Sequence, residues 1–89
     1  MGHMICTRVF PNNYSKKKIA KECDLHATYE GDYHHGLQPP IRFNDLVLKN
    51  EEEAERWVRE HDSGWYDNLA VRFKEGRKIN WYVKYEFHV

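Results

Sequence analysis

The stretch INWYVKYEF, residues 79–87, constrains the fold more than any other part of the chain. Apolar and polar side chains alternate along it, which is the pattern of a β-strand with one buried and one solvated face. The residues predicted to face the core are Ile79, Trp81, Val83, Tyr85 and Phe87. Those predicted to face water are Asn80, Tyr82, Lys84 and Glu86. With the strand pattern LAVRF at 69–73 and the turn EGRK between them, this predicts a hairpin.

Capping signals predict two helices. In NEEEAERWVREH, residues 50–61, Asn50 is placed to cap the helix and Glu53 follows three residues later as its capping-box partner. Apolar residues then recur at the spacing of a helix face, at Ala54, Trp57 and Val58. A second, shorter helix is predicted over roughly residues 16–23, with Ser15 as its cap.

The remaining segments complete a small α+β domain. Residues 4–10 favour a strand, residues 24–40 a long connection, and residues 41–48 either a tight hairpin or one bulged strand. The simplest architecture is an antiparallel sheet of about four strands with two helices packed on one face. Residues 1–3 read like a vector remnant, so a single domain is predicted over 4–89.

Composition argues against several classes of protein. Fourteen basic and fourteen acidic residues leave no net charge to attract nucleic acid or an anionic membrane. No apolar run approaches the ~18 residues of a membrane span. Two cysteines, Cys6 and Cys23, favour reduced thiols in the cytoplasm over a secreted disulfide scaffold. For so short a chain, homodimerisation is one way to bury more area.

Zinc binding is one alternative for the site. Cys23, His26, His34 and His35 have the spacing C-x2-H-x7-H-H and offer the sulfur and nitrogen ligands that zinc prefers. Adjacent histidines rarely bind the same ion, and the chain has no Cys-x2-Cys pair that would supply the other two ligands. Solvated histidines beside a core cysteine are therefore favoured, and no cofactor is predicted.

The sequence offers little for catalysis. Cys23 and His26 pair a thiol with a base, but Cys23 lies at the C-terminal end of its predicted helix, where the helix dipole opposes a thiolate. The acidic residues 51–53 open the other helix, where carboxylates are stabilising without any catalytic role. The expectation is that the protein is not an enzyme.

Single-stranded nucleic acid is a second alternative. The basic run SKKKIAK supplies Lys16, Lys17 and Lys21, and Tyr82 is placed on the predicted wet face of the last strand, where it could stack on a base. The neutral total charge and the lack of a known RNA-binding aromatic motif count against this reading.

Aromatic residues exceed what one small core needs, with three Trp, six Tyr and four Phe. Some must be exposed, and exposed Trp and Tyr are typical of binding hot spots. The segment GDYHHGLQPP, residues 31–40, brackets its two histidines with glycines and ends in two prolines, which favours a displayed loop. The predicted partner-binding residues are Tyr29, Tyr33, His34, His35, Trp65 and Tyr66.

Residues 43–75 resemble small uncharacterised proteins encoded by phages and prophages of Gram-positive bacteria. The shared features are a short strand, the capped helix with Glu52-Glu53-Ala54, the pair Trp65-Tyr66, and the strand 70–73. This resemblance implies a binding protein that inhibits a host enzyme or defence system by contacting a host protein or sequestering a small ligand. It also implies a location in the cytoplasm of an infected or lysogenic cell.

Overall fold

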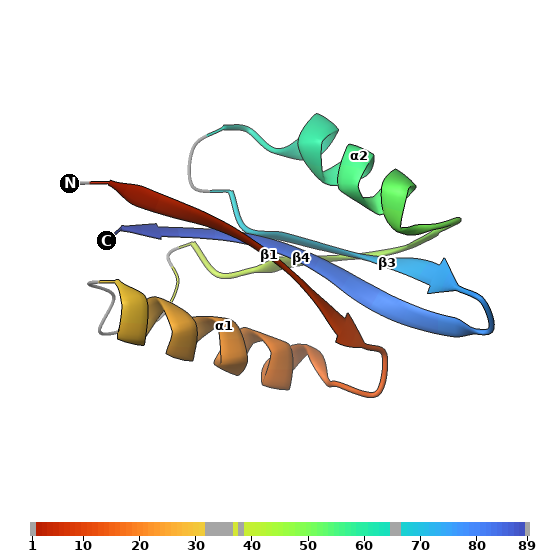
Figure 1. The fold of residues 1–89 in the computed structure, drawn as a ribbon, viewed down its shortest axis with the longest axis horizontal. Coiled ribbons are helices and arrows are strands. Elements are labelled where there is room, and N and C mark those ends of the chain that lie inside the picture. Colours follow the sequence, from red (N-terminus) through yellow and green to blue (C-terminus); the bar gives the residue numbers. More distant parts are fainter. Residues whose placement is uncertain (1, 32–36, 38, 65–66, 89) are drawn as a thin grey trace.

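A computed structural model describes residues 2–31, 37, 39–64 and 67–88. The described elements form one four-stranded sheet and two helices (Figure 1). In chain order they are β1 (His3–Pro11), α1 (Lys16–Glu30), β2 (Arg42–Leu48), α2 (Glu51–His61), β3 (Leu69–Glu75) and β4 (Lys78–His88). The strand order is β1-β4-β3-β2, so β4 is central and β1 and β2 are the edges.

The predicted α+β class and the C-terminal hairpin are confirmed, but the sheet is mixed. β4 runs antiparallel to β1 and to β3, whereas β2 runs parallel to β3. The unit β2–α2–β3 explains this pairing, since a helix between two strands carries the chain back to the end where it started. The expectation of a purely antiparallel sheet was therefore wrong for β2.

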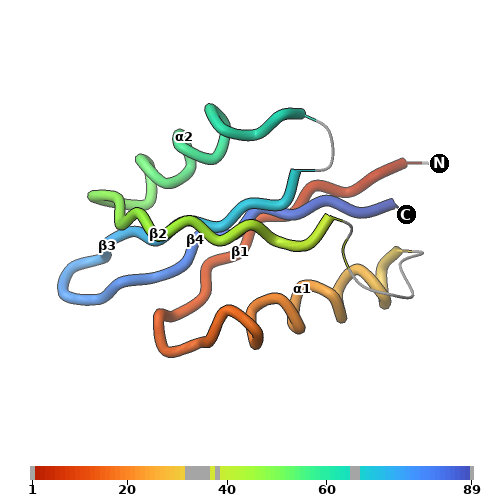
Figure 2. The backbone as a smooth tube through the Cα atoms, turned by 180° about the vertical axis from the view of Figure 1, so that it is seen from behind, coloured from red at the N-terminus to blue at the C-terminus, as the bar shows by residue number. Residues whose placement is uncertain are grey.

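The helices cover opposite faces of the sheet, which corrects the prediction that both lie on one face. Figure 2 shows the sheet between α1 and α2. On one face, Ile19, Cys23 and Ala27 of α1 pack in a cluster with alternate residues of β4. On the other face, Ala54 and Val58 of α2 pack with residues of β3. Because sheet residues alternate between faces, each helix needs its own set of apolar partners.

β4 is consequently buried on both faces, and not on one as predicted. The side chains expected inside are buried from Trp81 onward. Three side chains expected in water are buried as well: Tyr82 packs beneath α2, and Lys84 and Glu86 are each only 4% exposed. The face assignment from the alternation was right, but the second face is covered by α2 and by the segment that follows it.

Both helix caps are confirmed. The Ser15 side chain accepts a hydrogen bond from the Lys18 N–H, and the Asn50 side chain accepts one from the Glu53 N–H. The Glu53 carboxylate reaches back to the Lys49 N–H rather than to Asn50, so the predicted capping box is shifted by one residue. α1 runs seven residues further than the predicted end at residue 23, because the buried spacing continues to Ala27.

β2 is one bulged strand, which decides between the two readings of residues 41–48. Its register with β3 shifts between Phe43 and Val47. At the bulge, the Asn44 carboxamide accepts a hydrogen bond from the Leu46 N–H, and Arg72 of β3 donates to the Asp45 carbonyl. The bulge therefore interrupts the regular hydrogen-bond ladder of β2, and polar side chains satisfy backbone groups there.

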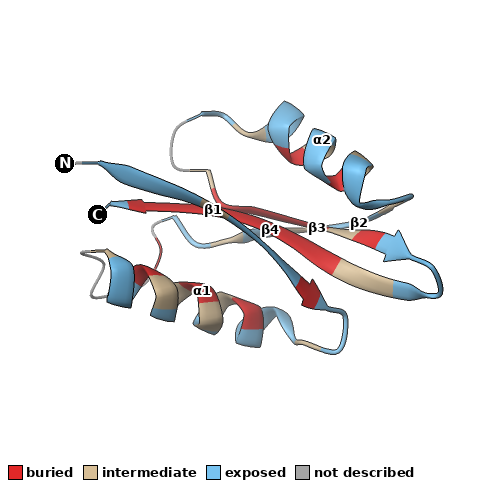
Figure 3. Ribbon diagram, in the orientation of Figure 1, coloured by how far each residue is buried: buried red, intermediate tan, exposed pale blue. Residues whose placement is uncertain are grey.

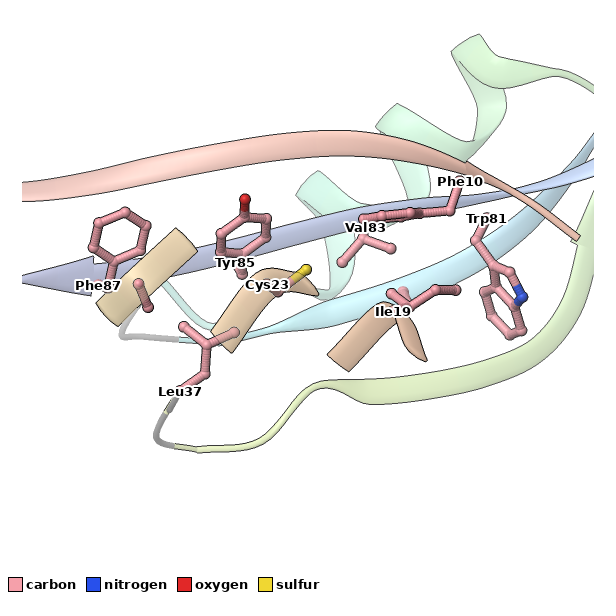
Figure 4. Packing of buried hydrophobic residues seen from close by; sticks show 10 residues of the cluster. Phe10, Ile19, Cys23, Leu37, Trp81, Val83, Tyr85 and Phe87 are labelled. Carbon is pink, nitrogen blue, oxygen red and sulfur yellow. The ribbon is translucent and has the colours of Figure 1, made fainter. Parts of the chain in front are cut away.

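The core between α1 and the sheet holds most of the large side chains. Figure 4 shows its aromatic and aliphatic residues between α1 and β4. The Trp81 ring meets the Phe43 ring edge to face, with 5.3 Å between their centroids. The cluster consists of Phe10, Ile19, Cys23, Ala27, Leu37, Ala70, Trp81, Val83, Tyr85 and Phe87.

Candidate binding surface at one end of the sheet

The two segments with most of the predicted binding residues leave the fold at the same end of the sheet. This end, where β4 finishes and β3 begins, is called the loop end below. The described residues that flank the segments are Gly31 and Leu37 for one, and Gly64 and Asp67 for the other. In Figure 1 the C-terminal end of α1 and the start of β3 lie on the same side of the molecule as the two termini.

A buried ionic group lies beneath the loop end. Lys84 Nζ is 2.7 Å from Glu86 Oε2, 2.8 Å from Asp62 Oδ2 and 2.7 Å from the carbonyl oxygen of Asp67. All three ammonium hydrogens of Lys84 therefore have an oxygen partner, which a buried lysine requires. Glu86 Oε2 also accepts a hydrogen bond from the Asp67 N–H.

The contacts within this ionic group lower the pKa of the Asp62 carboxyl. Partial burial opposes ionisation of the carboxyl, but hydrogen bonds from the Lys84 ammonium and the Gly64 N–H outweigh it and lower the pKa below its ordinary value. Asp62 is thus held as a carboxylate at neutral pH. Its charge fixes the start of the segment that follows α2.

Asn68 connects the two segments to each other. Its side chain is buried, and its Oδ1 accepts a hydrogen bond from the Glu86 N–H while its Nδ2 donates to the carbonyl of Pro39 at 2.6 Å. Its own carbonyl accepts from the Arg42 N–H. One carboxamide therefore joins the exit of the 31–40 segment, the end of β4 and the start of β3.

Arg42 and Ser63 extend these contacts toward the surface. Arg42 Nη2 lies 3.2 Å from both carboxylate oxygens of Asp67, and Asp67 Oδ2 accepts a hydrogen bond from the Ser63 N–H. The network that holds the loop end consists of Arg42, Asp62, Asp67, Asn68, Lys84 and Glu86.

The entry to the 31–40 segment is fixed by close packing. The Gly31 N–H donates to the Ala27 carbonyl at 2.9 Å, and a Cβ at Gly31 would collide with the His88 carbonyl oxygen and the Phe87 ring. Gly31 has an ordinary φ of −128°, so this position requires a glycine for space and not for its backbone angles, which differs from the expectation. Asp24 of α1 binds the Leu37 N–H at 2.9 Å.

Tyr29 is the predicted partner-binding residue that the structure places. It lies in the last turn of α1 at the loop end, and 84% of it is exposed. An exposed tyrosine of this kind is available for contact with a partner, and Tyr is enriched at binding hot spots. The other predicted contact residues, Tyr33, His34, His35, Trp65 and Tyr66, lie outside the described residues.

The nucleic-acid set is not brought together. Tyr82 is 7% exposed beneath α2 and hydrogen-bonded through its hydroxyl to Thr7, so it cannot stack on a base, which corrects that prediction. Lys16 forms an ion pair with Asp45 at 3.5 Å and lies over the Phe43 ring. Lys17 and Lys21 are exposed on the outer side of α1.

Cys23 and His26 have separate structural roles. Cys23 is fully buried in the core, where burial raises the pKa of its thiol to about 12, so it is not an activated nucleophile. His26 Nδ1 lies 2.6 Å from the Tyr85 hydroxyl. In the described part of the chain, no three His, Cys, Asp or Glu side chains are grouped as a metal site requires. His34 and His35 of the zinc hypothesis lie outside that part.

Sequence reasoning missed the ionic network altogether. Lys84 and Glu86 read as the wet face of a strand, and Asp62, Asp67 and Asn68 read as an ordinary polar connection. One signal was present: two opposite charges at i and i+2 share a face of a strand that is otherwise rich in large apolar residues.

Neither described helix is long and apolar enough to cross a membrane. Comparisons with protein-family models, with curated proteins and with solved structures found no match for this chain.

Proposed function

We propose that the protein is a binding module that acts by stoichiometric contact with a host protein through its loop end. The observation that carries the proposal is the buried network of Lys84, Glu86 and Asn68, which fixes the ends of both segments that hold the predicted contact residues. Tyr29 supplies an exposed aromatic side chain at the same end.

The network supports binding because of what buried charges do. A buried ion pair adds little net stability compared with well-packed apolar residues, since removing both charges from water costs about as much as their attraction returns. It does require a defined geometry from every partner. Fixing the described residues at both ends of a segment removes part of the conformational freedom that the segment would otherwise lose when a partner is bound.

The phage resemblance gives this contact a biological setting. Under the proposal, the protein inhibits a host enzyme or a defence system in the cytoplasm of a bacterial cell, by covering a surface and not by turnover. A small ligand is the alternative occupant of the same surface.

The experiment is co-purification from a Gram-positive bacterial lysate with quantitative mass spectrometry. The informative variants are Tyr29→Ala, the pair His34→Ala with His35→Ala, and the pair Trp65→Ala with Tyr66→Ala. Arg77→Ala is the matched control, because Arg77 is exposed in the β3–β4 turn at the opposite end of the sheet.

A host protein recovered with the wild type and the control, and depleted with at least one loop-end variant of unchanged melting temperature, supports the proposal. A partner that all variants retain equally would place the contact elsewhere. Catalytic turnover on a hydrolase panel, abolished by one point substitution, would remove the proposal of a non-enzymatic module.

A further inference from the structure

β1 is a nine-residue edge strand with one neighbouring strand in the described part of the chain. β1 pairs with β4 from His3 to Pro11 without a register shift. Its other side presents backbone groups that have no strand partner in the sheet. An exposed, regular edge of this length is a template for pairing with another strand.

The register shows which backbone groups point outward. The Asn12 N–H donates to the Ile79 carbonyl, and these two residues are opposite each other in the continued β1–β4 register. Hydrogen bonding alternates along an antiparallel pair. The backbone N–H and C=O groups of even-numbered β1 residues therefore point toward β4, and those of odd-numbered residues point away from the sheet edge. Pro11 is odd-numbered, and its missing N–H therefore costs β4 no partner. The outward N–H and C=O groups belong to Ile5, Thr7 and Val9.

These three residues also share one face of the sheet. They lie on the side of α2, but α2 packs over β3 and leaves this strand uncovered. Ile5 is 59% exposed and Val9 is 44% exposed, and Thr7 is exposed between them. Figure 3 shows β1 as exposed along most of its length.

The two edges of the sheet differ in protection. Charged side chains, prolines and bulges are among the usual devices that prevent edge pairing. β2 has the bulge with Asn44 and Asp45 described above. Between His3 and Pro11 at its two ends, the outward positions of β1 carry three β-branched residues and no charge.

We propose that β1 pairs with β1 of a second copy of this chain, antiparallel and about a two-fold axis at Thr7. In that register Thr7 lies opposite Thr7 of the other copy, and Ile5 of each copy lies opposite Val9 of the other. All of these would be hydrogen-bonded pairs, because all of the residues present their backbone groups outward. The apolar exposed side chains would cover each other, which is a self-complementary arrangement as a two-fold interface requires.

The charges on the other face of β1 fit the same register. Arg8 would lie opposite Cys6 of the second copy. Within one chain, the Glu30 carboxylate is close enough to Cys6 to raise the pKa of its thiol, although burial has the larger effect. The Arg8 guanidinium, which lies 4.6 Å from the Phe10 ring centroid in its own chain, would face the side of the second copy that carries Glu30, and the two-fold axis would make this approach occur twice.

Such pairing would join two sheets into one of eight strands and end there. The outer edges of the joined sheet would be the two bulged β2 strands, which lack a regular row of free backbone groups. The assembly would close at two copies instead of extending into a fibre.

The first test is the mass in solution by analytical ultracentrifugation over a wide dilution series. The wild type is expected to dimerise reversibly, and the double variant Ile5→Lys with Val9→Lys is expected to be a monomer because like charges would face the edge. Leu46→Lys is the control, since Leu46 is 49% exposed on the other edge strand. A monomeric wild type at every concentration, or a dimer that survives both lysines, would overturn the proposal.

Cross-linking tests the register and does not depend on the lysine variant folding. In a Cys6→Ser background, Thr7→Cys should form an intermolecular disulfide readily, since opposed residues have Cα atoms about 5.5 Å apart. Val9→Cys should not, because the two copies of residue 9 would be about 14 Å apart. Equal cross-linking of both, or faster cross-linking at position 9, would exclude the axis at Thr7. A monomer whose lysine variant loses a heterologous partner would show instead that β1 receives that partner's strand.

Discussion

Lys84 Nζ and Glu86 Oε2 are 2.7 Å apart, and both side chains are almost completely buried on the central strand. The two residues are separated by one position on β4 and therefore point to the same face of the sheet. A charged pair at this place fixes the loop end, and its removal should be among the most damaging changes on the molecule.

Lys84→Ala should destabilise the fold by about 3–5 kcal/mol, because Glu86 and Asp62 would be left as carboxylates without their buried cation. Chemical denaturation followed by tryptophan fluorescence measures the change. Lys74→Ala is the matched control on β3, where the lysine is exposed, and it should be nearly neutral. Equal effects of the two substitutions would show that Lys84 is accessible to water in solution.

Asp62 should make the fold sensitive to acid. Its pKa is lower in the folded state than the ordinary 3.8, so its ionisation stabilises the fold above that value and the contribution is lost as the pH falls through the folded pKa. Asp62→Asn should therefore reduce stability at neutral pH and flatten the loss of melting temperature below about pH 4. A variant with the same acid-induced slope as the wild type would contradict this role.

The two thiols should differ in reactivity. Burial raises the pKa of the Cys23 thiol to about 12, and Cys23 is fully buried while Cys6 is partly exposed. Iodoacetamide at mildly alkaline pH should modify Cys6 in the native protein and Cys23 only after unfolding, as peptide mass spectrometry would show. Modification of Cys23 at the rate of Cys6 would mean that α1 opens readily.

The same raised pKa has a consequence for stability. A thiol that ionises near 9.0 when unfolded and near 12 when folded stabilises the fold below pH 9, and this contribution is lost as the pH rises between the two values. Cys23→Ala should make the loss of stability with rising pH shallower above pH 9, as thermal melts in that range would show. Tyr85, whose pKa burial also raises to about 12, should account for part of the remaining slope.

Trp81→Ala should cost about 3–5 kcal/mol, because the indole is 4% exposed and fills the space between α1, β4 and Phe43. Trp57→Ala is a suitable comparison, since Trp57 is only partly buried on α2 and stacks on His61. Urea titration should give a much smaller loss for Trp57. A reversed order would mean that the α2 side carries the main core.

Gly31→Ala should destabilise the protein by about 1–3 kcal/mol, since the new methyl group would overlap with backbone atoms of β4 and α1 that cannot move aside. Gly76 offers a contrast. It has open space around it but a φ of 62°, so an alanine there is strained by its backbone angle alone. Hydrogen exchange at Leu37 and Asn68 should rise in the Gly31 variant and stay unchanged in Gly76→Ala.

The elements with local signals were predictable from sequence. The caps at Ser15 and Asn50 and the final hairpin depend on residues only a few positions apart, so local sequence is enough to predict them. The end of α1 was not recognised, because exposed Leu25 and the polar residue His26 obscure the helical period. The reason that His26 is tolerated there is a partner 59 residues away, the Tyr85 hydroxyl.

The arrangement of the elements was harder to predict. Alternation along β4 indicates one wet face, and Lys84 and Glu86 fit that reading until their partners from the 62–68 segment are known. A strand that is covered on both faces is usually apolar throughout its sequence. In β4, polar residues of a buried network occupy part of one face, so the sequence lacks this continuous apolar run. The parallel pairing of β2 was accessible, since a strand, a helix and a strand in succession between residues 41 and 75 form the usual parallel unit.

The position of β4 also governs when the protein can fold during its synthesis. β1 and β3 are neighbours of β4 and not of each other, so the ribosome must have made residues 78–88 before any β1 contact in the sheet can form. Until then, the nascent chain has only local helices and the β2–α2–β3 unit, and apolar residues of β1 and α1 such as Phe10 and Ile19 lack the β4 side chains that cover them. A chaperone that holds nascent chains would therefore find its binding sites on this protein until translation has passed the central strand.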